Sequence, residues 1–103
     1  MQLVSLMLAG ALLAAQAAQA EDAQVLLQKY DCHLCHARDE AKTGPAYVEI
    51  AAKYRDNPKA ALLLAAVVRK GAHGDGPWHM PPLPQVPDAD ARTMIEYILA
   101  MPK

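Results

Sequence analysis

Apolar positions along this chain recur mainly at helical spacing. The first such stretch follows Asp22, a residue type that caps helix N-termini, and its apolar members lie at i, i+3, i+4 and i+7: Ala23, Leu26, Leu27 and Tyr30. The same spacing recurs at residues 46–55. Two further helical stretches follow, one at 58–70 that is apolar almost all round and one at 88–101 with an apolar face. No stretch alternates apolar and polar residues as a half-buried strand would. The pattern predicts an all-α fold of about four helices.

Residue types that start or end helices set the predicted boundaries. Asn57 followed by Pro58 suits an N-cap with proline at the first helical position. Gly71 suits a C-cap that ends the third helix. Asp88 and Asp90 suit a helix start, where the helix dipole favours negative charge. The third helix is apolar almost all round, so we expect it to be well buried.

Residues 71–87 interrupt the helical pattern. Three glycines and five prolines fall within these seventeen residues, which predicts a loop without regular structure. Long loops in small domains are usually either functional or disordered. This one also carries apolar side chains that a disordered linker would lack: Trp78, His79, Met80, Leu83 and Val86. We therefore expect an ordered loop wrapped over a bound group or a core.

The first twenty residues form a segment of a different kind. Met1 to Ala20 contains no Lys, Arg, Asp or Glu and ends in Ala18-Gln19-Ala20. Such a stretch is typical of a secretory signal peptide with a small-residue cleavage site. An uncleaved anchor helix is the alternative, but the apolar part is short for a span of ~20 residues. We expect cleavage before Glu21, which leaves one exported domain at residues 21–103 without stable membrane insertion.

Length and charge narrow the class of protein. The chain has 103 residues, enough for one domain, and a formal net charge of −1. Near-zero charge argues against a nucleic-acid partner and against an anionic membrane surface. Without its leader the domain is small for a core made of protein alone, so a cross-link or bound group is expected to stabilise it.

Both cysteines of the chain lie in one short motif, Cys32-His33-Leu34-Cys35-His36. This C-x-x-C-H pattern is that of covalent c-type haem attachment. Cys32 and Cys35 would each form a thioether with a haem vinyl group, and His36 would bind the iron as its proximal ligand. The motif thus predicts one covalently attached haem c.

Two cysteines and a histidine at this spacing also have three other uses: a disulfide, a redox dithiol and a zinc site. Export makes a Cys32–Cys35 disulfide conceivable, whereas a redox dithiol normally lies in a βαβ context that this chain lacks. A structural zinc site needs four ligands, and the motif supplies three, with a fourth available from His33, His73 or His79. Counting ligands leaves zinc open. The export leader and the histidine directly after Cys35 favour haem.

A distal iron ligand is expected from the proline-rich loop. Met80 lies there, before Pro81 and Pro82, and a thioether favours ferrous iron and raises the reduction potential. Met94 and Met101 fall on a helical stripe and are expected to be core residues instead. His79 is the second candidate ligand. His33 and His73 are expected at the surface.

Residues around the ligands are expected to orient them. A backbone carbonyl, with that of Pro45 as the candidate, would accept the free N–H of His36. Four aromatic residues are candidates for the wall of the site or for hydrogen bonds to haem propionates: Tyr47, Tyr54, Trp78 and Tyr97.

With these residues assembled, the mature chain resembles the small bacterial class I cytochromes c of the cytochrome c-551 (c8) type. The resemblance covers essentially residues 21–103. Its specific pieces are the leading Glu21-Asp22 helix, the attachment motif, Gly44-Pro45-Ala46-Tyr47, Ala51-Ala52-Lys53-Tyr54 and Met80-Pro81-Pro82. The resemblance implies an all-α fold around one haem, with His36 and Met80 as axial ligands and the Pro45 carbonyl bonded to His36. It also implies electron transfer in the periplasm.

One departure from the family pattern concerns tryptophan. Members often carry a tryptophan-glycine pair a few residues before the ligand loop, with the indole against a propionate. Here that position falls within residues 72–76, and Trp78 stands two residues before Met80. Trp78 is a candidate for cofactor binding, but the resemblance does not assign it the propionate contact.

The function expected is that of a monomeric, non-enzymatic carrier of single electrons between respiratory donor and acceptor proteins. No nucleophile or general-base constellation is evident in the sequence. Two alternatives stay open: a cytochrome subunit bound to an exported dehydrogenase or reductase, and a haem protein that binds or senses gases. The four-helix form of the latter usually carries its attachment motif near the C-terminus, unlike this chain.

Overall fold

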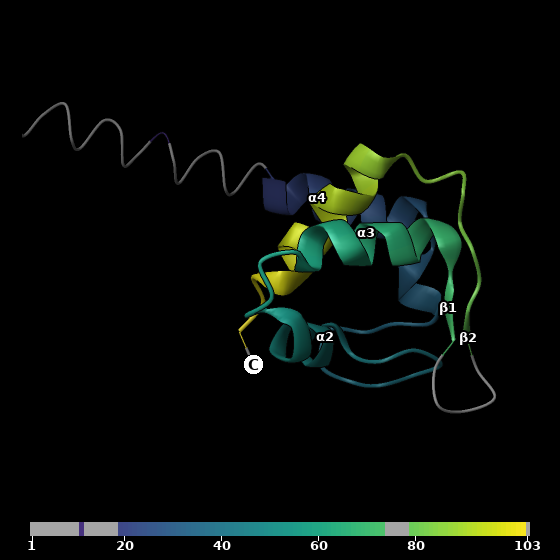
Figure 1. Ribbon diagram of the computed structural model, residues 1–103, viewed down its shortest axis with the longest axis horizontal. Helices are drawn as coiled ribbons and strands as arrows, with labels where there is room; N and C mark the ends of the chain where they lie inside the picture. Colours follow the sequence, from purple (N-terminus) through teal and green to yellow (C-terminus); the bar gives the residue numbers. More distant parts are fainter. Residues whose placement is uncertain (1–10, 12–18, 74–78, 103) are drawn as a thin grey trace, which may run out of the picture.

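Helices make up most of the fold (Figure 1). The computed structural model describes residues 11, 19–73 and 79–102. Residues 19–29 are helical, the 3-10 helix η1 follows at Cys32–Leu34, and three further helices complete the set: α2 (Tyr47–Tyr54), α3 (Ala60–Lys70) and α4 (Asp88–Leu99). The prediction of about four helices is confirmed. Most of the predicted leader, residues 1–10 and 12–18, lies outside the described residues, as does Trp78.

The last helix organises the packing. In Figure 1, α4 lies behind α3, and it packs against both α2 and α3. Two side-chain hydrogen bonds join it to the N-terminal segment: Tyr30 Oη donates to Asp90 Oδ2 at 2.7 Å, and Gln24 Nε2 donates to Tyr97 Oη at 2.9 Å. The bond to Asp90 raises the pKa of Tyr30, because it holds the proton on the phenol.

The core lies where these helices meet. Its buried members come from the first helix, from α2, α3 and α4, and from the segments on either side of α4: Leu27, Tyr47, Ala51, Ala65, Val68, Val86, Ala91, Met94, Ile95, Ile98 and Met101. Full burial of a Val, Leu, Ile or Met side chain contributes about 1.5–3 kcal/mol. Met94 and Met101 are buried, as predicted from their helical stripe.

Two predicted helix starts are wrong. The first helix already includes residues 19–21, so Asp22 is not its N-cap; Gln19 and Ala20 are good helix formers that carry the helix past it. The third helix begins at Ala60 and not at Pro58. Asn57 Oδ1 accepts the Lys59 N–H at 2.9 Å, an Asx-type bond that makes a separate turn ahead of the helix.

Regular structure also occurs where none was expected. Strand β1 (Ala72–His73) pairs with β2 (His79–Met80) in an antiparallel ladder with Ala72 opposite Met80 and His73 opposite His79. Both strands fall on residue pairs free of glycine and proline, so every N–H that the ladder needs is present. Figure 1 places the ladder at one end of α3. The prediction of an irregular stretch from 71 to 87 is corrected at these four residues.

Across the part of the chain that the structure describes, each helix is too short or too polar to cross a lipid bilayer.

Candidate functional site

An apolar cleft lies between the helices and takes in residues from distant parts of the chain. It encloses about 520 Å³ of space, including the solvent at its mouth. Cys32 and His36 reach it from the N-terminal segment and Met80 from β2, while the remaining lining residues come from the first helix and from α2, α3 and α4: Leu27, Tyr47, Ile50, Leu64, Val67, Val68, Met94, Ile95 and Ile98. The structure thus brings three of the predicted site residues into one hollow.

The two cysteines lie differently at this cleft. Both thiols are free; Cys32 is half-buried in the lining, whereas Cys35 is exposed and outside it. Burial raises the pKa of the Cys32 thiol, because the low-dielectric surroundings disfavour the thiolate. The motif therefore points one cysteine into the apolar space and leaves the other at its edge.

The chain after η1 holds His36 in one orientation. The His36 N–H donates to the Cys32 carbonyl at 3.0 Å, which continues the tight turn of the motif. Its ring nitrogen Nδ1 lies 2.7 Å from the Pro45 carbonyl oxygen. Because a carbonyl only accepts, Nδ1 carries the proton, and Nε2 keeps a lone pair available for a metal ion. This is the hydrogen bond expected of Pro45.

Gly44 supports the same ring by its lack of a side chain. A Cβ at this position would lie 2.8 Å from Nδ1 and 2.9 Å from Nε2 of His36, closer than real Cβ atoms come. The Gly44 N–H also donates to the Cys35 carbonyl at 2.7 Å, which fixes the loop against the motif. The sequence marked Gly44 only as a loop breaker; its close approach to the ring needed the fold.

Gly44→Ala is expected to destabilise the haem-loaded protein by about 1–3 kcal/mol, the usual range for overpacking a fitted site. The added methyl group must displace the His36 ring and lengthen the hydrogen bond from His36 Nδ1 to the Pro45 carbonyl. Urea unfolding followed by circular dichroism measures the loss, and Thr43→Ala, an exposed change in the same loop, should stay within about 0.5 kcal/mol. Equal free energies of unfolding for the two variants would contradict the close packing of Gly44 against the His36 ring.

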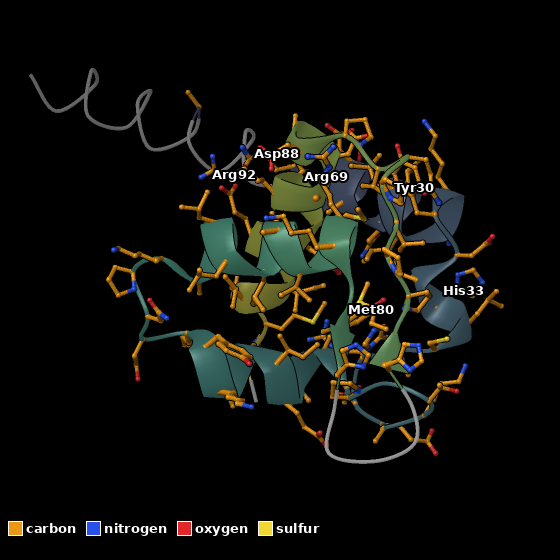
Figure 2. All side chains as sticks on the ribbon, turned by 45° about the vertical axis from the view of Figure 1, so that its right-hand side comes forward. Tyr30, His33, Arg69, Met80, Asp88 and Arg92 are labelled. Atoms are coloured by element: carbon orange, nitrogen blue, oxygen red, sulfur yellow. The ribbon has the colours of Figure 1, made fainter. Side chains whose placement is uncertain are left out.

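Met80 is held from both sides of its strand pair. After it, the Leu83 N–H donates to the Val68 carbonyl at 3.1 Å, and Arg69 Nε donates to the Val86 carbonyl at 3.1 Å. Before the strands, Gly71 adopts a φ of 82°, and a Cβ there would lie 2.7 Å from the Met80 carbonyl oxygen. Figure 2 shows Met80 near the strand pair and Arg69 at a distance from it, near Asp88 at the start of α4. These contacts anchor the loop on the end of α3.

The other histidines lie outside the cleft. His33, His73 and His79 are all exposed, and Figure 2 shows His33 at the outer edge of the molecule. Surface positions for His33 and His73 are as predicted. The described residues contain no group of three or more His, Cys, Asp or Glu side chains arranged to hold a metal ion, so the four-ligand zinc arrangement is not assembled in them.

Tyr47 lines the cleft and also contacts His36. Its ring stacks on that of His36, with centroids 5.6 Å apart and planes at 21°. Its hydroxyl is buried and has no hydrogen-bond partner within the described residues. Burial raises the pKa of Tyr47 to about 12. Tyr54 and Tyr97, weighed with it as wall residues, do not line the cleft.

These features fit a covalently attached haem. The cleft is apolar enough for the macrocycle, and Cys32 and His36 both line it. His36 Nε2 keeps a lone pair because Nδ1 is bonded to the Pro45 carbonyl. The buried Tyr47 hydroxyl has no partner within the described residues and would gain one from a polar group of a bound cofactor. The residues that would hold the group are Cys32, Cys35, His36 and Met80.

Known proteins support the same assignment. No protein-family model matches the chain. The chain is 41% identical over 99 residues to cytochrome c-551 of Pseudomonas aeruginosa, which covers 95% of this chain and 93% of that protein. It is 44% identical over 94 residues to cytochrome c-552 of Nitrosomonas europaea, covering 90% of this chain and 89% of that protein.

Solved structures show the same fold. The crystal structure of wild-type Nitrosomonas europaea cytochrome c552 superposes with a TM-score of 0.71 at 40% identity, over 74% of this chain and 95% of that one. The class 1 cytochrome MtoD of Sideroxydans lithotrophicus ES-1 superposes with a TM-score of 0.67 at 26% identity, over 78% and 92%. The chain therefore belongs to the class I cytochromes c, with the small bacterial cytochromes c-551 and c-552, and is a mono-haem electron-transfer protein with one covalently attached haem c.

Proposed function

We propose that this cytochrome shuttles single electrons between respiratory donor and acceptor proteins in the periplasm, with His36 and Met80 as the axial ligands of its haem iron. One observation carries the ligand assignment: His36, with Nε2 left free, and Met80 line the same apolar cleft although they are far apart in the sequence. The bound haem supplies the one-electron Fe(III)/Fe(II) couple.

The residues of the chain set the conditions for that couple. Cys32 and Cys35 anchor the group through thioethers, and the Pro45 carbonyl holds the His36 ring and strengthens its donor power. A methionine thioether is a soft ligand, which favours the ferrous state and raises the potential. The apolar lining acts in the same direction, because low dielectric disfavours the extra positive charge of the ferric state.

Ligation by both His36 and Met80 also supports the proposal of an electron carrier. With both axial positions taken by side chains, no site is left for a small ligand, so gas binding is disfavoured. Single-electron transfer makes and breaks no substrate bond, so the proposed function needs no nucleophile or general base. We infer a monomer that meets its partners transiently, and the subunit of a larger exported enzyme is the alternative that co-purification would reveal.

Location rests on the leader. The uncharged stretch to Ala20 with its Ala18-Gln19-Ala20 end supports export and cleavage before Glu21. Covalent haem attachment after export would then give the mature domain of residues 21–103.

The test is to produce the full chain in a bacterium that matures c-type cytochromes. We expect it in the periplasmic fraction with Glu21 as its first residue, and its ferric spectrum should contain a methionine–iron charge-transfer band. A matched chain that starts at Met followed directly by Glu21 should stay in the cytoplasm without covalent haem. Haem-loaded protein in both compartments would contradict export, and a periplasmic protein lacking the band would contradict Met80 ligation alone.

A further inference from the structure

Two histidines face each other across the small sheet. His73 on β1 is the register partner of His79 on β2, and their ring centroids are 5.0 Å apart with the planes inclined by 37°. Both side chains are exposed. Neither takes part in the haem cleft, so the haem proposal leaves this pair without a role.

The ladder keeps the pair apart from the iron ligand next to it. Successive residues of a strand point to opposite faces. Met80 is half-buried and lines the cleft, and its register partner Ala72 is also half-buried. His73 and His79, one position along each strand, must therefore point to the other face, which is open to solvent. The Ala72–Met80 pair therefore faces the cleft, and the His73–His79 pair faces solvent.

We propose that His73 and His79 form a binding site for one divalent late transition-metal ion, of the Zn²⁺, Ni²⁺ or Cu²⁺ class, with water completing its coordination. Imidazole nitrogen suits these ions. Each nitrogen must come to about 2.0–2.1 Å from the metal. Ring centroids 5.0 Å apart are close enough for this once the two exposed side chains rotate so that their in-plane nitrogen lone pairs converge on the ion. Strand pairing holds the two donors in register before the ion arrives, which lowers the entropic cost of binding.

Metal binding would also cross-link the strands that carry Met80. The ion ties β1 to β2 directly beside that residue, and the unfolded chain has no strand pairing to hold the two imidazoles together. An ion that binds the native state more tightly than the unfolded state stabilises the native state. The site thus provides a clamp on the ligand loop whose occupancy follows the free metal concentration.

The experiment titrates Zn²⁺ into the haem-loaded ferric protein at neutral pH by calorimetry. We expect one ion per chain in the wild type, and at least tenfold weaker binding in His73→Asn and in His79→Asn separately. His33→Asn, which removes another exposed histidine, is the matched control and should bind as the wild type does. Zn²⁺ should raise the melting temperature of the wild type and of His33→Asn only.

Other results would overturn the site. A stoichiometry other than one ion per chain, or an equal loss of zinc affinity in all three variants, would mean that zinc binds the surface histidines independently. Absence of any binding would exclude the site. His79→Asn changes the residue next to Met80, so a folding defect there is checked by circular dichroism; His73→Asn, on the other strand, then decides alone. None of these readouts depends on which side chain binds the haem iron.

Discussion

The double variant Cys32→Ala, Cys35→Ala is expected to contain no covalent haem and to lose most of its helical structure after export. The two thiols are the only cysteines of the chain, so no other residue can form the thioethers. Without the group, the apolar cleft would expose core side chains from all four helices to water. At about 25 cal/mol for each square ångström of apolar surface, a small domain loses a large part of its stability.

Acid extraction followed by a haem stain of the denatured protein measures the covalent link, and far-ultraviolet circular dichroism measures the helices. The matched controls are the two single variants, each of which keeps one thiol and should keep a fraction of its haem through extraction. Haem retained by the double variant after acid extraction would sink covalent attachment at this motif.

Met80→Ala is expected to remove the methionine–iron charge-transfer band, to lower the midpoint potential by on the order of 0.1 V within the ~0.8 V range that axial ligands span, and to let the ferrous protein bind carbon monoxide. Loss of the thioether both opens a coordination position and removes the ligand that favours ferrous iron. Potentiometric titration and absorption spectra measure the three effects. Met94→Leu, a change to another methionine of the cleft lining, should alter none of them strongly.

The outcome also separates Met80 from the second candidate ligand. If His79 were the ligand, Met80→Ala would leave carbon monoxide binding absent, and His79→Asn would open the site instead. His79 is exposed and outside the cleft, so we expect the opposite. An unchanged spectrum in Met80→Ala would remove Met80 from its role.

Helices were predictable because their signals are local. The pattern of apolar residues identified the first helix, α2, α3 and α4, though not the short η1, and Gly71 and Asp88 marked one end and one start correctly. The helix starts predicted at Asp22 and Asn57 were wrong for two reasons. At Asp22 the preceding residues extend the helix, and at Asn57 the side chain forms a separate turn ahead of the helix. The strands β1 and β2 were missed because two residues are too few to show alternation.

The residues of the site likewise divide into those that a local sequence signal predicted and those that only the fold brings together. Cys32, Cys35 and His36 form a contiguous motif whose chemistry is legible in the sequence. Met80 stood out by its setting among prolines. Gly44 and Gly71 act through close approach to His36 and to the Met80 carbonyl, and this approach depends on how the loops fold back, which the sequence does not show. The apolar residues that α2, α3 and α4 contribute to the cleft read as ordinary core positions in the sequence, since a core and a cofactor pocket use the same side chains.

The anchoring of the Met80 segment bears on the speed of electron exchange. A change in the charge of a metal ion tends to shift its ligands, and the energy of that rearrangement slows transfer. Here the segment is fixed by Gly71 on one flank and by the bonds of Leu83 and Arg69 on the other, and prolines at 81, 82, 84 and 87 leave the backbone few alternatives. For the proposed ligand Met80, both oxidation states would then share nearly one geometry, which keeps the inner-sphere reorganisation energy small.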